Sequence, residues 1–248
     1  MSGALPDAPS SRAPTGDFIC RFAHIEARFE ARPWPWAEQR RDAIAAHWAR
    51  RASERPKLFN GRVLLIGDHA IEGDVFRATY FATDYANFLY WLDHGTPDRS
   101  IFNGFAMGAA QGSDGGYLLG VMSEHTATAG KVYFPAGTPD RSDLRPDGTV
   151  DLATSVVREF EEETGLAPCD YAVADGWIVV RSGGLIAFMR SVSFREPAES
   201  VRGRIRAFLA RQREPELADV RIVRSLADLD EAVMPAYLQA FLRWAYDE

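Results

Sequence analysis

The stretch SVVREFEEETGL, residues 155–166, decides how this chain is interpreted. It places four glutamates within positions 159–163 and then closes on Thr-Gly-Leu. Asp151 is a good N-cap for a helix over 152–164, and Gly165 suits the residue after its last turn. The sequence therefore predicts a helix whose C-terminal half is crowded with like charge.

Helical geometry divides these charges into two groups. Positions i, i+3 and i+4 share one face, so Glu159, Glu162 and Glu163 lie together while Glu161 points elsewhere. The opposite flank is apolar and is expected to pack on a sheet. It consists of Ala153, Val156, Val157 and Phe160. The helix thus separates a carboxylate face from a core face.

The carboxylate face opposes helix stability. Like charges at i, i+4 each cost about 0.2–0.5 kcal/mol, and anions in the last turn oppose the helix dipole. Arg158 can reach Glu162, but one arginine cannot neutralise three carboxylates. A divalent cation can, because hard Mg²⁺ prefers carboxylate oxygen and bridges to phosphate. The alternative is a solvated acidic surface.

The composition restricts the class of partner. With 46% hydrophobic and 25% charged residues, the 248-residue chain is typical of a globular protein, and its net charge of -7 argues against a nucleic-acid-binding surface. Cys20 and Cys169 are isolated, so we expect no disulfide framework or zinc site and a cytoplasmic location. No apolar run approaches the roughly 20 residues of a membrane span, and no signal peptide is evident. A small-molecule partner is therefore expected.

The pattern of strands and helices divides the chain into three parts. Residues 1–16, rich in Pro, Ser, Gly and Ala, are expected to form a disordered tail. Residues 17–100 predict a small mixed lobe of strands and helices. Residues 101–248 predict strand, turn, strand, the glutamate helix, two strands, a helix, a strand and a terminal helix. This order indicates an α/β (α+β) fold in which helices sandwich a mixed sheet.

The letters REFEEETGL, residues 158–166, resemble the second half of the Nudix hydrolase box, R-E-U-x-E-E-x-G-U, where U is a bulky apolar residue. All of its specified positions match. They are Arg158, Glu159, Phe160, Glu162, Glu163, Gly165 and Leu166. Upstream, YFPAG is similar to the entry of the box, with Gly137 at the place of its first glycine. The resemblance covers about residues 101–247 and implies a Nudix-type α/β/α sandwich.

The loop that leads into the helix departs from the family pattern. Arg158 follows Gly137 by 21 places, seven more than in the box, and Val150 stands where the first box glutamate would be. Asp151 is one place late and is expected to be mainly the helix N-cap, with a metal or supporting role as the alternative. The inserted loop carries three further acids that we expect to be turn residues. They are Asp140, Asp143 and Asp147.

The resemblance also implies roles for particular residues. The ligands of Mg²⁺ or Mn²⁺ would be Glu159, Glu162 and Glu163. Arg158 would orient a glutamate. A carboxylate on a late loop would complete the site or act as base, with Glu216 the first candidate and Glu214 the second. The implied reaction is metal-assisted attack by water on the diphosphate linkage of a nucleotide, so the catalytic set is Arg158, Glu162, Glu163 and Glu216. Nudix relatives are often dimers, so a homodimer is expected.

Substrate specificity is expected to come from residues 17–100 and from the loop MSEHTATAGKV, residues 122–132. Residues 58–91 resemble the region before the box in the UDP-sugar diphosphatase branch, which makes a nucleoside-diphosphate sugar the first expected substrate. ADP-ribose, NAD(H) and coenzyme A derivatives stay open. His125 could contact phosphate. Four aromatic residues could stack a base or belong to the core. They are Trp34, Trp36, Tyr80 and Phe81. The alternative function is a catalytically silent Nudix module that binds a nucleotide or a protein partner.

Overall fold

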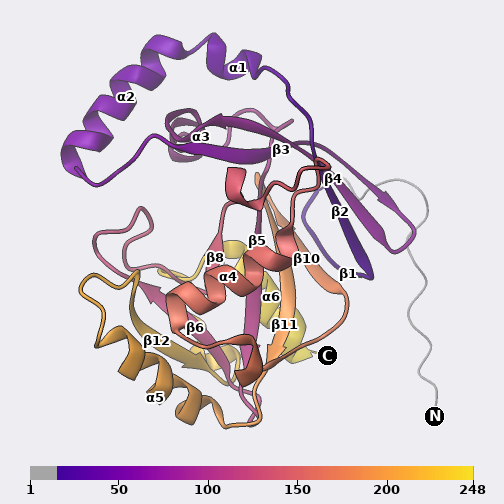
Figure 1. The fold of residues 1–248 in the computed structure, drawn as a ribbon, viewed down its shortest axis with the longest axis vertical. Helices are drawn as coiled ribbons and strands as arrows, with labels where there is room; N and C mark the ends of the chain where they lie inside the picture. The colour runs from indigo at the N-terminus through magenta and orange to yellow at the C-terminus, as the bar shows by residue number, and fades with distance from the viewer. Residues whose placement is uncertain (1–15, 248) are drawn as a thin grey trace.

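Two sheets organise the computed structural model, which describes residues 16–247 (Figure 1). The predicted tail, residues 1–16, falls almost entirely outside that range. The larger sheet runs in the order β1 (Phe18–Phe22), β10 (Trp177–Ser182), β11 (Leu185–Ser193), β5 (Asn103–Gln111), β6 (Tyr117–Met122) and β12 (Leu217–Val223). Three short strands extend it: β7 (Val132–Tyr133) on β6, β8 (Ala136–Gly137) on β5 and β9 (Ala172–Val173) on β11. Because β11 is parallel to β5 and antiparallel to β10, the sheet is mixed.

Helices cover both faces of the larger sheet. They are α4 (Leu152–Thr164), α5 (Ala198–Leu209) and α6 (Ala236–Asp247). Side chains of β5 alternate between the faces: Ala110 packs with Phe160 of α4 and Val201 of α5, whereas Met107 packs with Phe241 of α6. The predicted sandwich of helices around a mixed sheet is therefore confirmed.

The smaller sheet and its helices form the upper part of the view in Figure 1. Its strands run in the order β2 (His24–Phe29), β4 (Val75–Asp84) and β3 (Arg62–Glu72), and its helices are α1 (Pro35–Glu38), α2 (Arg41–Glu54) and α3 (Tyr85–Asp93). One face packs on the larger sheet, where the rings of Phe76 and Phe188 lie 5.3 Å apart. The other face packs on the helices, where Phe81 and Trp34 lie 5.9 Å apart.

Backbone pairing crosses the boundary that we predicted near residue 100. The strand β1, from the predicted lobe, pairs with β10 at the edge of the larger sheet. Isolated bridges join Ile66 to Phe102 and Val63 to Asp140. The three single-turn helices η1 (Arg141–Asp143), η2 (Pro168–Asp170) and η3 (Leu226–Asp228) complete the element list. Within residues 16–247, no helix combines the length and apolar character needed to cross a bilayer.

Candidate active site on helix α4

Both ends of α4 are capped as the sequence predicts. The Asp151 carboxylate accepts a hydrogen bond from the Thr154 amide at 3.1 Å, and Gly165 adopts φ 69° while its amide bonds to the Glu161 carbonyl. The second oxygen of Asp151 accepts from Arg145 at 2.6 Å. Because both oxygens are occupied by the cap and the arginine, Asp151 is an N-cap in this structure.

The buried side of α4 fixes how the helix lies on the sheet. Leu152, Val156 and Phe160 follow at i, i+4 and i+8 and are almost completely buried. On β5, a Cβ added at Gly108 would lie only 3.2 Å from the Phe160 ring, so this glycine admits the close approach. Ala153, which we predicted to face the core, is exposed. The buried arc is rotated toward Leu152, so the predicted phase of the helix was partly wrong.

The three glutamates of the carboxylate face lie at different depths. Glu163 is 4% exposed as a residue, whereas the side chains of Glu159 and Glu162 are 17% and 61% exposed. The rotation toward Leu152 carries Glu163 inward with the apolar side chains. The exposure of the carboxylates on the predicted shared face therefore increases from Glu163, which is buried, through Glu159 to Glu162, which is solvated.

Glu163 has one carboxyl oxygen without a partner in the described chain. Its Oε1 accepts from the Ala136 amide of β8 at 3.2 Å, and Oε2 is buried with no hydrogen bond to protein. Burial, with the charges of Glu216 and Glu159, raises the pKa of Glu163 to about 9. A buried carboxyl among other carboxylates is an environment in which a bound cation would favour the ionised form.

Glu159 lies directly against Gly137, the residue at the place of the first box glycine. A Cβ on Gly137 would lie 2.3 Å from Oε1 of Glu159, so glycine lets this carboxylate lie against β8 without shifting. Burial raises the pKa of Glu159, while the adjacent Arg158 guanidinium lowers it and Glu162 raises it. The strand β8 thus contacts two of the three predicted ligands.

Arg158 joins the glutamates to the inserted loop. Its Nη1 lies 2.8 Å from Glu159 and 3.5 Å from Glu162, and its Nη2 donates to Oδ1 of Asp143 at 3.0 Å. Arg158 thus lies beside Glu159, and its orienting role stays a prediction. The contact with Asp143 was not predicted.

Among the acids of the insertion, Asp143 combines the expected turn role with the contact to Arg158. Its side chain is 4% exposed, and its second oxygen accepts from the Asp140 amide at 3.0 Å. Asp140 and Asp147 do act as turn residues, because each accepts from a backbone amide two residues later. The sequence signal available for Asp143 was its place in an insertion that carries three aspartates.

Glu216 and Glu214 are separated by their surroundings. Both are exposed, and Glu214 lies 2.6 Å from Nζ of Lys57, which lowers its pKa. The charge of Glu216, just before β12, raises the pKa of both Glu163 and Glu159. We use the name carboxylate cluster for Glu159, Glu162, Glu163 and Glu216.

Tyr133 is a neighbour of this cluster that we did not predict. Burial, together with the charges of Glu163 and Glu216, raises its pKa, and its hydroxyl lies 2.7 Å from the Thr128 hydroxyl. It precedes the Phe-Pro-Ala-Gly entry to the predicted box, so its position near the site could have been found from the motif.

The cluster suits a hard divalent cation in its chemistry. Its donors are carboxylate oxygens, and Glu163 Oε2 is a buried acceptor without a partner. As placed, however, no three His, Cys, Asp or Glu side chains within residues 16–247 already form a ligand set. The side chain of Glu162 is mostly exposed and lies 3.5 Å from Arg158.

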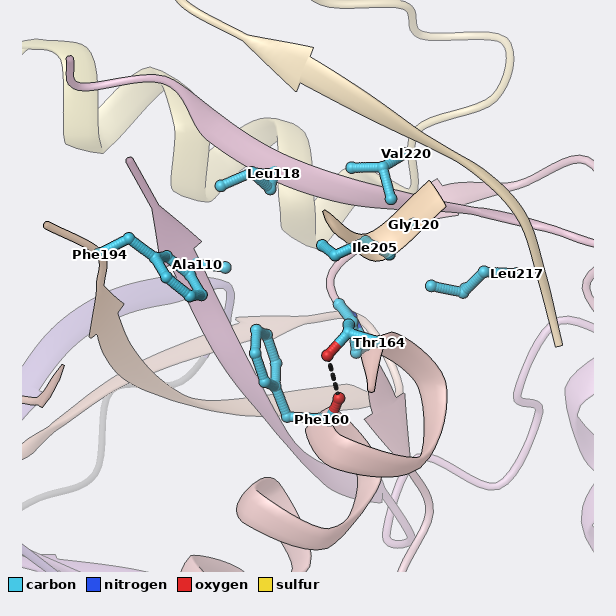
Figure 2. Close-up of a pocket in the computed structure, with 10 residues that line it drawn as sticks. Ala110, Leu118, Gly120, Phe160, Thr164, Phe194, Ile205, Leu217 and Val220 are labelled. Carbon is cyan, nitrogen blue, oxygen red and sulfur yellow. Dashed lines mark hydrogen bonds between the residues drawn. The ribbon is translucent and has the colours of Figure 1, made fainter. Parts of the chain in front are cut away.

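A small space between α4 and the larger sheet is lined by apolar side chains, and none of the carboxylate cluster residues lines it. Figure 2 shows Phe160 and Thr164 facing it, with the Thr164 hydroxyl donating to the Phe160 carbonyl. Its lining also includes Leu118, Phe194 and Ile205, and its volume is about 10 Å³. A space of this size holds one water at most, so it is a packing defect of the core rather than a substrate site.

The aromatic candidates for base stacking belong mostly to the core. Trp34 is 5% exposed and the Tyr80 and Phe81 side chains are fully buried, as the core interpretation predicted. Trp36 is half-buried and stacks on Trp34 at 5.3 Å. His125 is exposed in the loop between β6 and β7.

Comparisons with known proteins give matches among solved structures alone. No family model matches the chain, and no curated protein matches it by sequence. An Ap4A hydrolase from C. elegans is 15% identical over 56% of this chain and 92% of its own, with a TM-score of 0.39. A MutT protein from Methanosarcina mazei Go1 is 19% identical over 58% and 92%, with a TM-score of 0.35. The Nudix hydrolase RenU from M. smegmatis is 19% identical over 58% and 87%, with a TM-score of 0.36.

Proposed function

We propose that this protein is a Nudix-type nucleotide diphosphatase that uses Mg²⁺ or Mn²⁺. The observation that carries the proposal is the buried Oε2 of Glu163, which lacks a hydrogen-bond partner in the described chain. Glu163 lies among other carboxylates on a helix whose sequence matches the second half of the Nudix box. A structural acidic surface would keep such charges in water rather than bury one. The first substrate class is a nucleoside-diphosphate sugar, on the resemblance of residues 58–91.

Each residue of the cluster has a task in this mechanism. Glu159, Glu162 and Glu163 would hold the metal, which when bound polarises the diphosphate oxygens and lowers the pKa of water. Arg158 keeps the Glu159 carboxylate in place through the 2.8 Å contact, and Asp143 fixes the other arm of the guanidinium. Glu216 would accept the proton of the attacking water, since its charge acts on both Glu163 and Glu159.

The test is a panel of nucleotide diphosphates with Mg²⁺ or Mn²⁺ and products identified by mass. We expect metal-dependent cleavage between two phosphorus atoms, giving two phosphate-containing fragments or one fragment and inorganic phosphate. The bond that is cleaved identifies the subclass of nucleotide diphosphatase. Absence of turnover across the panel with either metal would contradict the proposal.

A catalytically silent module that binds a nucleotide is the second candidate. It is favoured by Val150 at the place of the first box glutamate. Metal-dependent nucleotide binding without turnover in the same panel would identify it.

A further inference from the structure

The segment between α2 and β3, residues 55–61, contacts two loops that adjoin strands of the larger sheet. Arg55 Nη1 donates to the Thr126 carbonyl at 2.6 Å, in the loop between β6 and β7. Lys57 Nζ donates to Glu214 at 2.6 Å, in the loop before β12. We call residues 55–61 the connecting segment, because these contacts bridge the two loops.

Both loops lead to Glu216 of the carboxylate cluster. The Ser123 amide donates to the Glu216 carbonyl at 2.9 Å, and its hydroxyl donates to the Pro215 carbonyl at 2.7 Å. The Thr126 hydroxyl donates to the Ser123 carbonyl at 2.8 Å. A continuous set of hydrogen bonds therefore links Arg55 to the residue that we assign as base. The connecting segment therefore contacts the loop that carries Glu216.

Phe59 in this segment is exposed, and the two residues that follow it bond to the start of α3. It is 83% exposed, whereas the other large apolar side chain exposed in the described chain, Leu226, is 40% exposed. On the C-terminal side, Asn60 accepts from the Ala86 amide and the Gly61 carbonyl accepts from the Tyr85 amide, each at 2.8 Å. A Cβ on Gly61 would lie 3.2 Å from the Phe59 ring, so the ring lies over its own turn.

An exposed aromatic ring can stack on a flat ligand. Single exposed apolar residues are common and need no function. Phe59 differs because it lies in the segment whose Arg55 and Lys57 contact the loops that lead to Glu216. Every nucleobase has a flat face, and stacking on an aromatic side chain tolerates differences in base identity.

We propose that Phe59 is the platform on which the nucleobase of the substrate stacks, which makes the connecting segment a specificity element for base-containing diphosphates. This inference rests on the proposed function, because it takes the diphosphate to lie at the carboxylate cluster. The residue that recognises the base would then be Phe59, and not one of the aromatic residues that the sequence suggested and that are buried in the core.

The experiment measures binding of the fluorescent nucleotide etheno-ADP, with Mg²⁺ present, to the full chain. We expect Phe59→Ala to raise the dissociation constant at least about fivefold, and Phe59→Trp to keep it within about twofold of the parent value. Leu226→Ala is the matched control, since it removes an exposed apolar side chain beyond the far end of β12, and we expect no change. Inorganic pyrophosphate, which has no base, should compete equally well in the parent protein and in Phe59→Ala.

Several results would overturn the inference. They are equal etheno-ADP affinity in the parent and Phe59→Ala, no etheno-ADP binding by the parent, or equal loss of etheno-ADP and pyrophosphate affinity in the variant. Failure of the proposed hydrolysis is a different result. A parent protein that binds etheno-ADP through Phe59 but cleaves no diphosphate would retain this inference and refute the enzyme.

Discussion

The guanidinium of Arg158 lies 3.0 Å from the carboxylate of Asp143, which the loop between β8 and α4 buries to 4% side-chain exposure. The same guanidinium lies 2.8 Å from Glu159. One arginine therefore couples an inserted loop to a predicted metal ligand. In this chain, Asp143 rather than Asp151 supplies the acidic partner from the lengthened segment.

Asp143→Asn tests this coupling. Without the Asp143 charge, Arg158 pairs more fully with Glu159 and Glu162 and competes with the metal. We expect the Mg²⁺ concentration for half-maximal hydrolysis to rise at least about tenfold, with the folded circular dichroism spectrum retained. Asp147→Asn is the matched control, because Asp147 bonds only within its turn. Equal effects of the two substitutions would refute the positioning role.

Gly137→Ala tests the contact between β8 and Glu159. The added Cβ would lie 2.3 Å from Oε1 of Glu159, so the end of this flexible side chain must move. We expect kcat to fall at least about tenfold while the free energy of unfolding changes by less than about 1 kcal/mol. Gly203→Ala, on the exposed face of α5, meets nothing within 4 Å and should stabilise by about 0.5–1 kcal/mol. Unchanged kcat in Gly137→Ala would contradict the placement of Glu159.

The raised pKa of Glu163 leads to a prediction of how the free energy of unfolding depends on pH in the metal-free protein. Its pKa is about 9 in the folded chain, against an ordinary 4.5, so the folded state binds a proton that the unfolded state releases between these values. The free energy of unfolding therefore falls as pH rises through this window. We expect thermal melts in chelator to show a steeper fall from pH 5 to pH 8.5 for the parent than for Glu163→Gln.

Metal should reverse this trend, because it binds the deprotonated carboxylate. Mn²⁺ is expected to raise the melting temperature of the parent more at pH 8.5 than at pH 6, and to raise that of Glu163→Gln little at either pH. Identical pH profiles for the two proteins in chelator would show that Glu163 is not the titrating group.

Glu216→Gln and Glu214→Gln separate the two candidates for the base. The charge of Glu216 raises the pKa of Glu163, whereas Glu214 pairs with Lys57 at 2.6 Å. With Glu216 as base, Glu216→Gln should lower kcat at least about 100-fold, and Glu214→Gln should change it little. A larger loss of kcat in Glu214→Gln than in Glu216→Gln would reassign the base.

Local sequence signals predicted the elements well. The helix α4 has the predicted bounds, because its Asp151 cap and its left-handed Gly165 are strong local signals. Periodicity does not set the rotation of a helix about its axis, and for this reason Ala153 was placed on the wrong side. That rotation depends on which helix side chains fit against the sheet, for example the Phe160 ring against Gly108 of β5.

Long-range contacts could not be predicted in this way. The pairing of β1 with β10 joins residues far apart in the chain, and no local pattern specifies the partner of an amphipathic strand. The contact between Asp143 and Arg158 likewise depends on how the inserted loop folds back. Acids in a loop rich in Pro, Gly and Asp resemble turn residues until their burial is known.

The central claim is that the carboxylate face of α4 holds the metal that cleaves a diphosphate. It is tested most directly by kcat of Glu162→Gln and Glu163→Gln at saturating Mn²⁺, on the best substrate of the panel, against Glu161→Gln on the same helix. We predict a loss of at least about 100-fold for the first two with folding retained, and a change within about twofold for Glu161→Gln. Equal rates for all three variants would contradict the account.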